Sequence, residues 1–230
     1  MKRGLFMNAK KDEAEILIYE SIGQSWWNDS GVGAKQFAED LKALGAVKVL
    51  NIRINSPGGD VFEGNAIKTQ LEQHPAVKNV FIDGLAASAA SYIAMAGNRI
   101  EISKNALFMI HNASGGVLGN AEDMRKMADL LEKIDGNIAD MYQRRTSQPL
   151  DTIQEWMTAE TWFNAEETVK HGFADAVMAE ESAAEPAAVF NLDRFRNAPK
   201  VAIAAKVDES FLIDQEFRRK KLELLKARSA

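Results

Sequence analysis

The chain has 230 residues, of which 46% are hydrophobic and 27% are charged, and its formal net charge is −5. This composition is typical of a soluble globular protein, and no basic stretch indicates a nucleic-acid groove. The absence of cysteine excludes disulfide bonds, a thiolate nucleophile and Cys-ligated metal sites. Three histidines leave few ligands for a multi-histidine metal site, and no apolar run approaches the roughly 20 residues that span a bilayer. We therefore expect a cytoplasmic protein.

Strand and helix patterns alternate through the first half of the chain, after residues 1–14, which we expect to form a flexible N-terminus. Alternating or continuous apolar runs predict strands at 15–19, 47–54, 77–82, 99–102 and 106–111. Apolar residues three or four apart predict helices at 34–45, 62–75 and 86–96. This alternation predicts an α/β domain with a largely parallel sheet. Ligands of such sheets bind beyond the carboxyl ends of the strands.

A longer helix is predicted from Ala121 to about Arg145, with methionines, leucine and isoleucines on one stripe. At 1.5 Å per residue it would span nearly 40 Å, which is more than a small domain needs. We interpret it as a projecting helix that docks on another subunit, with an ordinary core helix as the alternative. Residues 15–178 then form the catalytic domain, closed by a helical hairpin and a terminal strand. Residues 179–230 are expected to be a linker and a C-terminal tail with a basic amphipathic stretch at 217–225.

Ser88 lies in the small-residue segment Gly84–Ser91, at a strand-to-helix turn. Unpaired N–H groups at a helix N-terminus favour developing negative charge, and small neighbours allow a substrate backbone to approach. The alanines beside Ser88 distinguish this segment from a Gly-x-Ser-x-Gly elbow. The segment predicts either a nucleophilic serine or a close-packed helix that its serines merely cap.

Segment 55–59, Asn-Ser-Pro-Gly-Gly, follows a predicted strand and precedes a predicted helix. Its glycine N–H groups are candidate oxyanion donors, of the kind whose removal costs about 2.7–4 kcal/mol in comparable sites. A tight turn that needs glycine for a positive φ is the alternative interpretation. A phosphate-binding loop is not expected, because no Gly-Lys-Ser/Thr sequence follows.

His111 ends an apolar strand and precedes a third glycine turn, which contains Gly115 and Gly116. It is either a structural histidine or the partner of a nucleophile. In a chain without cysteine, a Ser–His couple is the available nucleophile–base pair, and a carboxylate should orient the imidazole. The acids after the long helix, which the residues alone do not rank, are Asp151, Glu155, Glu160, Glu166, Glu167 and Asp175. Glycosidase chemistry is not expected, because no two acids pair at strand ends.

Three short motifs follow one another along the chain: Ile-Asn-Ser-Pro-Gly-Gly at 54–59, Ala-Ala-Ser at 86–88 and Met-Ile-His at 109–111. Together they resemble the proteolytic subunit of the Clp protease family, over roughly residues 15–178. The resemblance implies a crotonase-like α/β spiral of βαβ units with a projecting handle helix, which matches the long helix predicted here. It also implies a serine endopeptidase whose subunits form a homo-oligomeric ring or stacked rings around enclosed active sites.

By the same resemblance, Ser88 corresponds to the nucleophile and His111 to the general base. Gly59 and Ala89 match the backbone oxyanion donors. Glu160 stands where the family usually has aspartate, and its additional methylene group shifts the carboxylate.

Asp175 is the alternative acid, although it matches a family position that is not catalytic. We expect Gly58, Gly115 and Gly116 to contact the polypeptide substrate. The resemblance implies no metal and no cofactor.

Other segments refine the resemblance. Residues 60–64 and 84–91, with the tail after residue 179, resemble phage and prophage Clp-like proteases, which process capsid or scaffold proteins during head maturation. Such a protein would act in the cytoplasm or in assembling proheads. The family allows an AAA+ unfoldase as partner, but the segment before the first strand does not resemble the family's axial loop, so dependence on one is not expected. The alternatives are a catalytically decayed Clp-like structural ring and a crotonase-type acyl-CoA enzyme.

Overall fold

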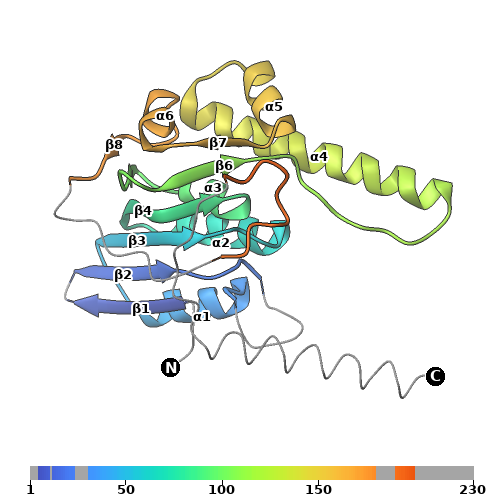
Figure 1. Ribbon diagram of the computed structural model, residues 1–230. Helices are drawn as coiled ribbons and strands as arrows, with labels where there is room; N and C mark the ends of the chain where they lie inside the picture. The colour runs from blue at the N-terminus through green and yellow to red at the C-terminus, as the bar shows by residue number, and fades with distance from the viewer. Residues whose placement is uncertain (1–4, 11, 24–30, 180–189, 200–230) are drawn as a thin grey trace, which may run out of the picture. The chain divides into compact units, whose positions relative to one another are not determined.

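A computed structural model describes residues 5–10, 12–23, 31–179 and 190–199 of the chain (Figure 1). Within these residues the central sheet contains eight strands, six of which follow the order β1–β2–β3–β4–β5–β8. Their bounds are β1 Leu5–Lys10, β2 Glu13–Ile18, β3 Val49–Ser56, β4 Val77–Ala87, β5 Arg99–Ile102 and β8 Ala176–Val177. The other two, β6 (Leu107–Ile110) and β7 (Thr161–Phe163), extend from β4, which pairs with β6.

The pairing of the strands confirms the predicted α/β fold with a largely parallel sheet. Strands β2 to β5, β8 and the β4–β6 pair are parallel. The described antiparallel pairs are β1–β2 and β6–β7, so the sheet as a whole is mixed. Helices connect most of the parallel strands, as a parallel crossover requires.

Strand β4 changes partners along its length. Its residues 79–82 pair with β5, whereas residues 85–87 pair with β6. The register between β3 and β4 shifts at the same level, and such an irregularity bends a strand. As a result the carboxyl ends of β4 and β6 lie side by side, with Ala87 opposite Met109.

Three helices follow the first strands: α1 (Ala34–Ala43), α2 (Val61–Gln73) and α3 (Ala89–Ala94). Helix α2 packs against both of the others. A Cβ on Gly64 of α2 would lie 2.7 Å from the hydroxyl oxygen of Tyr92, so glycine permits the close approach of α2 and α3. The same hydroxyl donates a hydrogen bond of 2.8 Å to the carbonyl of Val61. This contact fixes α3, the helix that begins after Ser88.

Helix α4 (Ala121–Thr146) is the long helix that the sequence predicts, and it projects beyond the sheet (Figure 1). Its buried residues are Ala139 and Tyr142, both in the C-terminal half. In the N-terminal half, Met124 is 54% exposed and Leu130 is 42% exposed. An ordinary core helix would cover such side chains, so the interpretation of α4 as a projecting element is favoured.

The chain after α4 forms α5 (Leu150–Thr158), β7, α6 (Ala165–Lys170) and β8. The predicted helical hairpin and terminal strand correspond to α5, α6 and β8, but β7 was not predicted. Three residues are too few for an alternating pattern to be recognised. None of the helices in the described part of the chain is long and apolar enough to span a membrane.

Two predicted boundaries require correction. A flexible segment 1–14 was expected, but Leu5–Lys10 forms β1 and pairs antiparallel with β2, because the edge of β2 offers unpaired backbone groups. The catalytic domain was expected to end at residue 178, yet residues 190–198 belong to the same compact unit and pack on it. The predicted linker lies almost entirely outside the described residues, and the basic stretch 217–225 lies wholly outside them.

Candidate active site

Ser88 stands between β4 and α3 in a backbone conformation that is rare for a residue with a side chain. Its φ is 54° and its ψ is −126°, and such strain costs on the order of 1–3 kcal/mol. The carbonyl of Ser88 accepts hydrogen bonds from the backbone N–H of Ser91 at 2.9 Å and from its hydroxyl at 2.6 Å. The N–H of Ser88 donates to the carbonyl of Met109 at 3.1 Å. These three bonds hold the strained turn in place.

His111 directly follows β6, and the strand register brings it to Ser88. Because Ala87 lies opposite Met109 on two parallel strands, the residues beyond the two strand ends meet at one edge of the sheet. The Nε2 atom of His111 lies 2.8 Å from the Oγ atom of Ser88, which is a hydrogen-bond distance. The structure thus brings together the two side chains that the sequence predicts as nucleophile and base.

The surroundings of His111 favour its neutral form. Burial lowers the pKa of the imidazole, the negative charge of Glu160 acts in the opposite direction, and the positive charges of Arg194 and Arg196 lower the pKa further. The net pKa lies below the usual value of 6.5. At neutral pH the ring is therefore uncharged and able to accept a proton from Ser88.

Glu160 reaches the site through the short strand β7. Thr161, the first residue of β7, lies opposite Ile110 in the antiparallel pair with β6. Glu160 and His111 consequently flank the same end of that pair. Among the candidate acids named from the sequence, Glu160 is the one whose charge acts on His111.

The carboxylate of Glu160 is bound by residues near the C-terminus of the described chain. The backbone N–H of Asn197 donates to Oε1 at 2.6 Å, and that of Arg196 donates to Oε2 at 3.0 Å. The indole Nε1 of Trp162 lies 3.5 Å from Oε1. His111 donates none of the hydrogen bonds that this carboxylate accepts from the described residues. Burial by itself raises the pKa of Glu160, but these donors and the charge of His111 hold it below its usual value.

Gly58 and Gly59 follow β3 and lie close to Ser88. Gly58 has a φ of 77°, and a Cβ on it would lie 2.6 Å from the backbone nitrogen of Ala89, so only glycine fits there. Two backbone hydrogen bonds of 3.0 Å pair this turn with Ile22 and leave the N–H of Gly59 unused by the pairing. Ala89 is the first residue of α3, so its N–H has no partner inside the helix. The two predicted oxyanion donors therefore both lie beside the candidate nucleophile.

A cleft of about 390 Å³ lies over the site, and Gly59, Ser88, His111 and Glu160 line it. Gly115 and Gly116 are not among its lining residues. A Cβ on Gly115 would instead lie within 3.6 Å of side chains of α4, and a Cβ on Gly116 would meet no atom within 4 Å. Contact of these two glycines with substrate stays a prediction.

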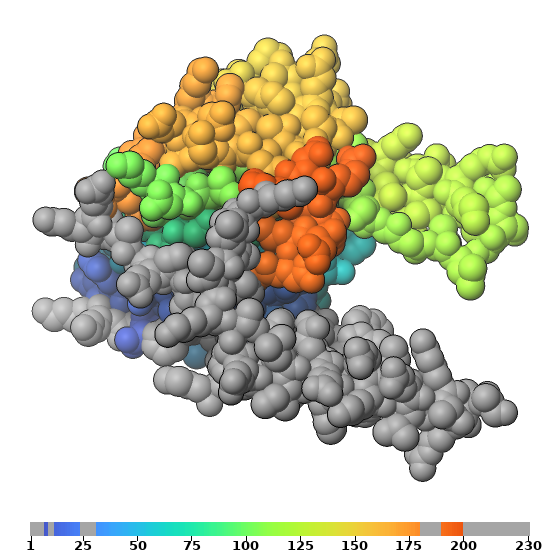
Figure 2. All heavy atoms as spheres, viewed as in Figure 1, coloured from blue at the N-terminus to red at the C-terminus, as the bar shows by residue number. Residues whose placement is uncertain are grey.

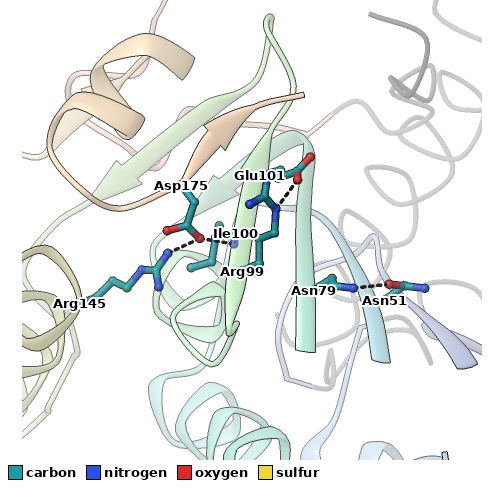
Figure 3. A network of polar contacts seen from close by, with 7 residues as sticks. All are labelled: Asn51, Asn79, Arg99, Ile100, Glu101, Arg145 and Asp175. Carbon is teal, nitrogen blue, oxygen red and sulfur yellow. Dashed lines mark hydrogen bonds and ion pairs between the residues drawn. The ribbon is translucent and has the colours of Figure 1, made fainter. Parts of the chain in front are cut away.

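Asp175, the alternative acid, has a different environment (Figure 3). Its Oδ2 atom accepts hydrogen bonds of 2.7 Å from the backbone N–H of Ile100 and from the guanidinium of Arg145. Burial raises the pKa of Asp175, but these donors and the charge of Arg99 hold it below its usual value. The carboxylate thereby joins the end of α4 to β5 rather than facing His111.

Several residues of the site were not predicted from the sequence. Phe195 packs edge-on against the ring of His111 with a centroid distance of 5.5 Å. Arg194, Phe195 and Arg196 line the cleft, and Trp162 contacts Glu160. No local pattern points to them, because their contacts with the site join segments that are far apart in the sequence. The described residues contain no group of three or more His, Asp or Glu side chains that could hold a metal ion.

Comparison with known proteins identifies the family. The profile of the Clp protease family matches residues 6–181. The chain belongs to the Clp protease family. It is 35% identical over 141 residues to the ATP-dependent Clp protease proteolytic subunit 2 of Thermobifida fusca (strain YX), an alignment that covers 60% of this chain and 69% of that protein. It is 36% identical over 135 residues to the ATP-dependent Clp protease proteolytic subunit of Pleurastrum terricola, with 56% and 67% covered.

The solved structure of a ClpP1 mutant from Listeria monocytogenes is similar in fold, with a TM-score of 0.64 and 21% identity. The match covers 74% of this chain and 93% of that one. These findings confirm the Clp protease fold predicted from the sequence. Membership of the family makes the chain a serine endopeptidase of the Clp protease type.

Proposed function

We propose that this Clp-type protease cleaves peptide bonds through Ser88, His111 and Glu160. Ser88 Oγ attacks the scissile carbonyl while Nε2 of His111 takes its proton. The oxygen that becomes negative is bound by the N–H groups of Gly59 and Ala89. His111 then gives the proton to the leaving amine, and water hydrolyses the acyl-enzyme in a second, equivalent step.

The distance of 2.8 Å between Ser88 Oγ and His111 Nε2 carries this proposal. A nucleophile and a base at hydrogen-bond distance, in a cleft and next to two backbone donors, form the arrangement that acyl transfer requires. The low pKa of His111 supports the role of base, because a neutral ring is present at neutral pH.

Glu160 is assigned the role of the orienting acid. Its carboxylate is ionised, and its charge already acts on His111. In the active enzyme its carboxylate would accept a hydrogen bond from the Nδ1–H group of His111, which fixes the ring in the tautomer whose Nε2 is free to take a proton. A catalytically decayed ring is the rival interpretation, because the bonds of Glu160 go to Arg196 and Asn197 instead.

The protease is proposed to act as a homo-oligomeric ring or as stacked rings. The uncovered apolar side chains of α4, among them Met124 and Leu130, support a subunit contact through this helix. The relatives are named as ATP-dependent proteolytic subunits. We infer that this chain nevertheless works without an obligatory AAA+ unfoldase, since residues 1–14 do not resemble the family's axial loop.

The finer proposal concerns the substrate. Residues 60–64 and 84–91 resemble phage and prophage Clp-like proteases, so the substrate class would be capsid or scaffold proteins of a phage head. Incubation of the protease with a co-encoded capsid or scaffold protein should give discrete fragments. If the protease cleaves other polypeptides but not these, the assignment as a serine endopeptidase stands and the proposed phage role is wrong.

Labelling with a fluorophosphonate, followed by mass-spectrometric mapping, tests the catalytic assignment. We expect modification of Ser88, and loss of the modification in His111→Ala. A folded, assembled protein in which neither the unchanged chain nor any folded variant that retains Ser88 and His111 is labelled at Ser88 would instead favour the decayed ring. Labelling at another serine would show that this other serine, and not Ser88, is the nucleophile.

A further inference from the structure

Residues 190–198, named the strap below, lie over the candidate active site although they come after the predicted catalytic domain. Figure 2 shows this segment in orange against the surface of the sheet and beside the base of α4. Three of its residues, Arg194, Phe195 and Arg196, line the same cleft as Ser88 and His111. The strap therefore forms part of the wall of the cleft that holds the candidate nucleophile.

Phe195 is the apolar anchor of the strap. Its side chain is 7% exposed and packs with Leu85, Ala87 and Met109, at the ends of β4 and β6. Its ring also meets the rings of His111 and Trp162 edge-on, at centroid distances of 5.5 and 5.6 Å. Such aromatic contacts add to the burial of apolar area. The anchor thus lies directly against the candidate base.

Polar contacts fix the strap on both sides of this anchor. The guanidinium of Arg194 donates to the carbonyl of Pro57, in the turn that carries the oxyanion glycines. On the other side, the side-chain amide of Asn197 donates to the carbonyl of Ala159 at 2.7 Å. The strap is thus bonded to the turn of the oxyanion glycines on one side and to the residue before Glu160 on the other.

The strap also contacts the carboxylate of Glu160, the candidate triad acid. The N–H groups of Arg196 and Asn197 both donate to its carboxylate, one to each oxygen. A carboxylate that serves a catalytic histidine must accept a hydrogen bond from its Nδ1. In the structure the strap and Trp162 donate the hydrogen bonds that this carboxylate accepts, and among the described residues none comes from His111.

We propose that the strap is an autoinhibitory element, which keeps the protease latent by walling off part of the cleft and by engaging the carboxylate of Glu160. This proposal rests on the proposed triad. Displacement of the strap opens the cleft beside Ser88 and frees Glu160 to pair with His111. A strap that instead positions Glu160 for catalysis would give the opposite result in the experiment below.

The experiment measures the rate of fluorophosphonate labelling at Ser88, and of peptide hydrolysis, in full-length variants. Phe195→Ala removes the anchor. Asn197→Pro removes one N–H donor to Glu160 and the side-chain bond to Ala159, and it leaves the Phe195 side chain itself unchanged. Asp193→Ala is the matched control, because this residue belongs to the strap but is exposed. Thermal denaturation verifies that each variant is folded.

We expect both labelling and hydrolysis to rise by about tenfold or more in Phe195→Ala and Asn197→Pro, which corresponds to about 1.4 kcal/mol or more. Asp193→Ala should behave as the unchanged chain. A synthetic peptide of residues 190–199, added to Phe195→Ala, should slow the labelling again, whereas a scrambled peptide should not. Because Asn197→Pro changes an exposed residue, it tests the proposal even where Phe195→Ala fails to fold.

Two results would overturn the proposal, and they differ. If the unchanged chain is labelled at Ser88 and the strap variants are labelled equally fast or more slowly, the strap is not inhibitory but the proposed function stands. If neither the unchanged chain nor any folded strap variant is labelled, the site holds no activated serine, and both proposals fail.

Discussion

The hydroxyl of Tyr142 lies 2.6 Å from the Oγ atom of Ser91, in the buried contact between α4 and α3. Ser91 in turn donates to the carbonyl of Ser88 at 2.6 Å. A chain of two hydrogen bonds therefore runs from the projecting helix to the strained residue that carries the candidate nucleophile. Tyr142 is 1% exposed, so no water replaces its hydroxyl easily.

Tyr142→Phe should loosen the turn at Ser88. We expect the free energy of unfolding to fall by about 1 kcal/mol, the typical net value of a hydrogen bond, and kcat to fall several-fold with little change in KM. Denaturant unfolding and steady-state kinetics measure the two effects. Tyr92→Phe is the matched control, since that hydroxyl bonds to Val61 and not to Ser91. Equal kcat values for the two variants would contradict a positioning role for Tyr142.

The turn at Gly59 should tolerate no side chain. A Cβ on Gly59 would lie 2.0 Å from the carbonyl oxygen of Ile22, so Gly59→Ala must displace one of the two segments. Such overpacking typically costs about 1–3 kcal/mol, and the displaced N–H should lower kcat by about 10²-fold or more. Gly136→Ala in α4 is the control, because a Cβ there meets no atom within 4 Å. It should be neutral or stabilising, since alanine favours helix.

The pH dependence of kcat/KM should show the depressed pKa of His111. Burial and the charges of Arg194 and Arg196 outweigh Glu160, so the folded pKa lies below 6.5. The neutral base therefore persists to lower pH, and we expect the acidic limb of the profile to have its midpoint below 6.5. The unfolded chain binds a proton near 6.5 whereas the folded chain does not, so this group costs stability as the pH falls below that value. A midpoint above 6.5 would contradict this expectation.

Replacement of Glu160 should reveal whether it is the triad acid. Glu160→Gln keeps the size of the side chain and removes its charge, and we expect kcat to fall by about 10⁴-fold, as for a serine protease whose triad acid became an amide. Asp175→Asn is the matched control and should retain kcat. It should lower stability by about 1 kcal/mol or less, because its contact with Arg145 is partly exposed. Near-normal rates for Glu160→Gln would show that Glu160 is not the triad acid.

The projecting half of α4 should mediate assembly. Leu130 is 42% exposed, so Leu130→Glu should leave the fold of each subunit within about 0.5 kcal/mol. Burying the new charge in a subunit contact would be costly, and we expect smaller species in analytical ultracentrifugation. Asp129→Ala, at an exposed neighbouring position, is the control. An unchanged sedimentation profile for Leu130→Glu would show that the contact lies elsewhere.

The local pattern of residues 15–146 was sufficient to predict the alternation of strands and helices, the parallel sheet and the long helix. It also located Ser88 and His111, because each stands where an apolar strand gives way to small residues. These features depend on periodicity and on turn residues, which a single segment contains in full. Gly58 was recognisable for the same reason, as its φ of 77° reflects a local turn.

Only the tertiary structure decided how these segments combine. The 2.8 Å contact between Ser88 and His111 follows from the register of β4 and β6, and the position of Glu160 follows from β7, a strand too short to recognise. The strap depends on contacts between Phe195 and strand ends about a hundred residues away in sequence. Strand register and the packing of a distant segment depend on contacts between parts of the chain that are far apart in sequence. The local pattern of either part does not indicate the other. For that reason the sequence by itself indicated a serine-protease chemistry and, by resemblance, Glu160 as its acid, whereas the tertiary structure decided how Glu160 lies relative to His111 and which segment packs over the site.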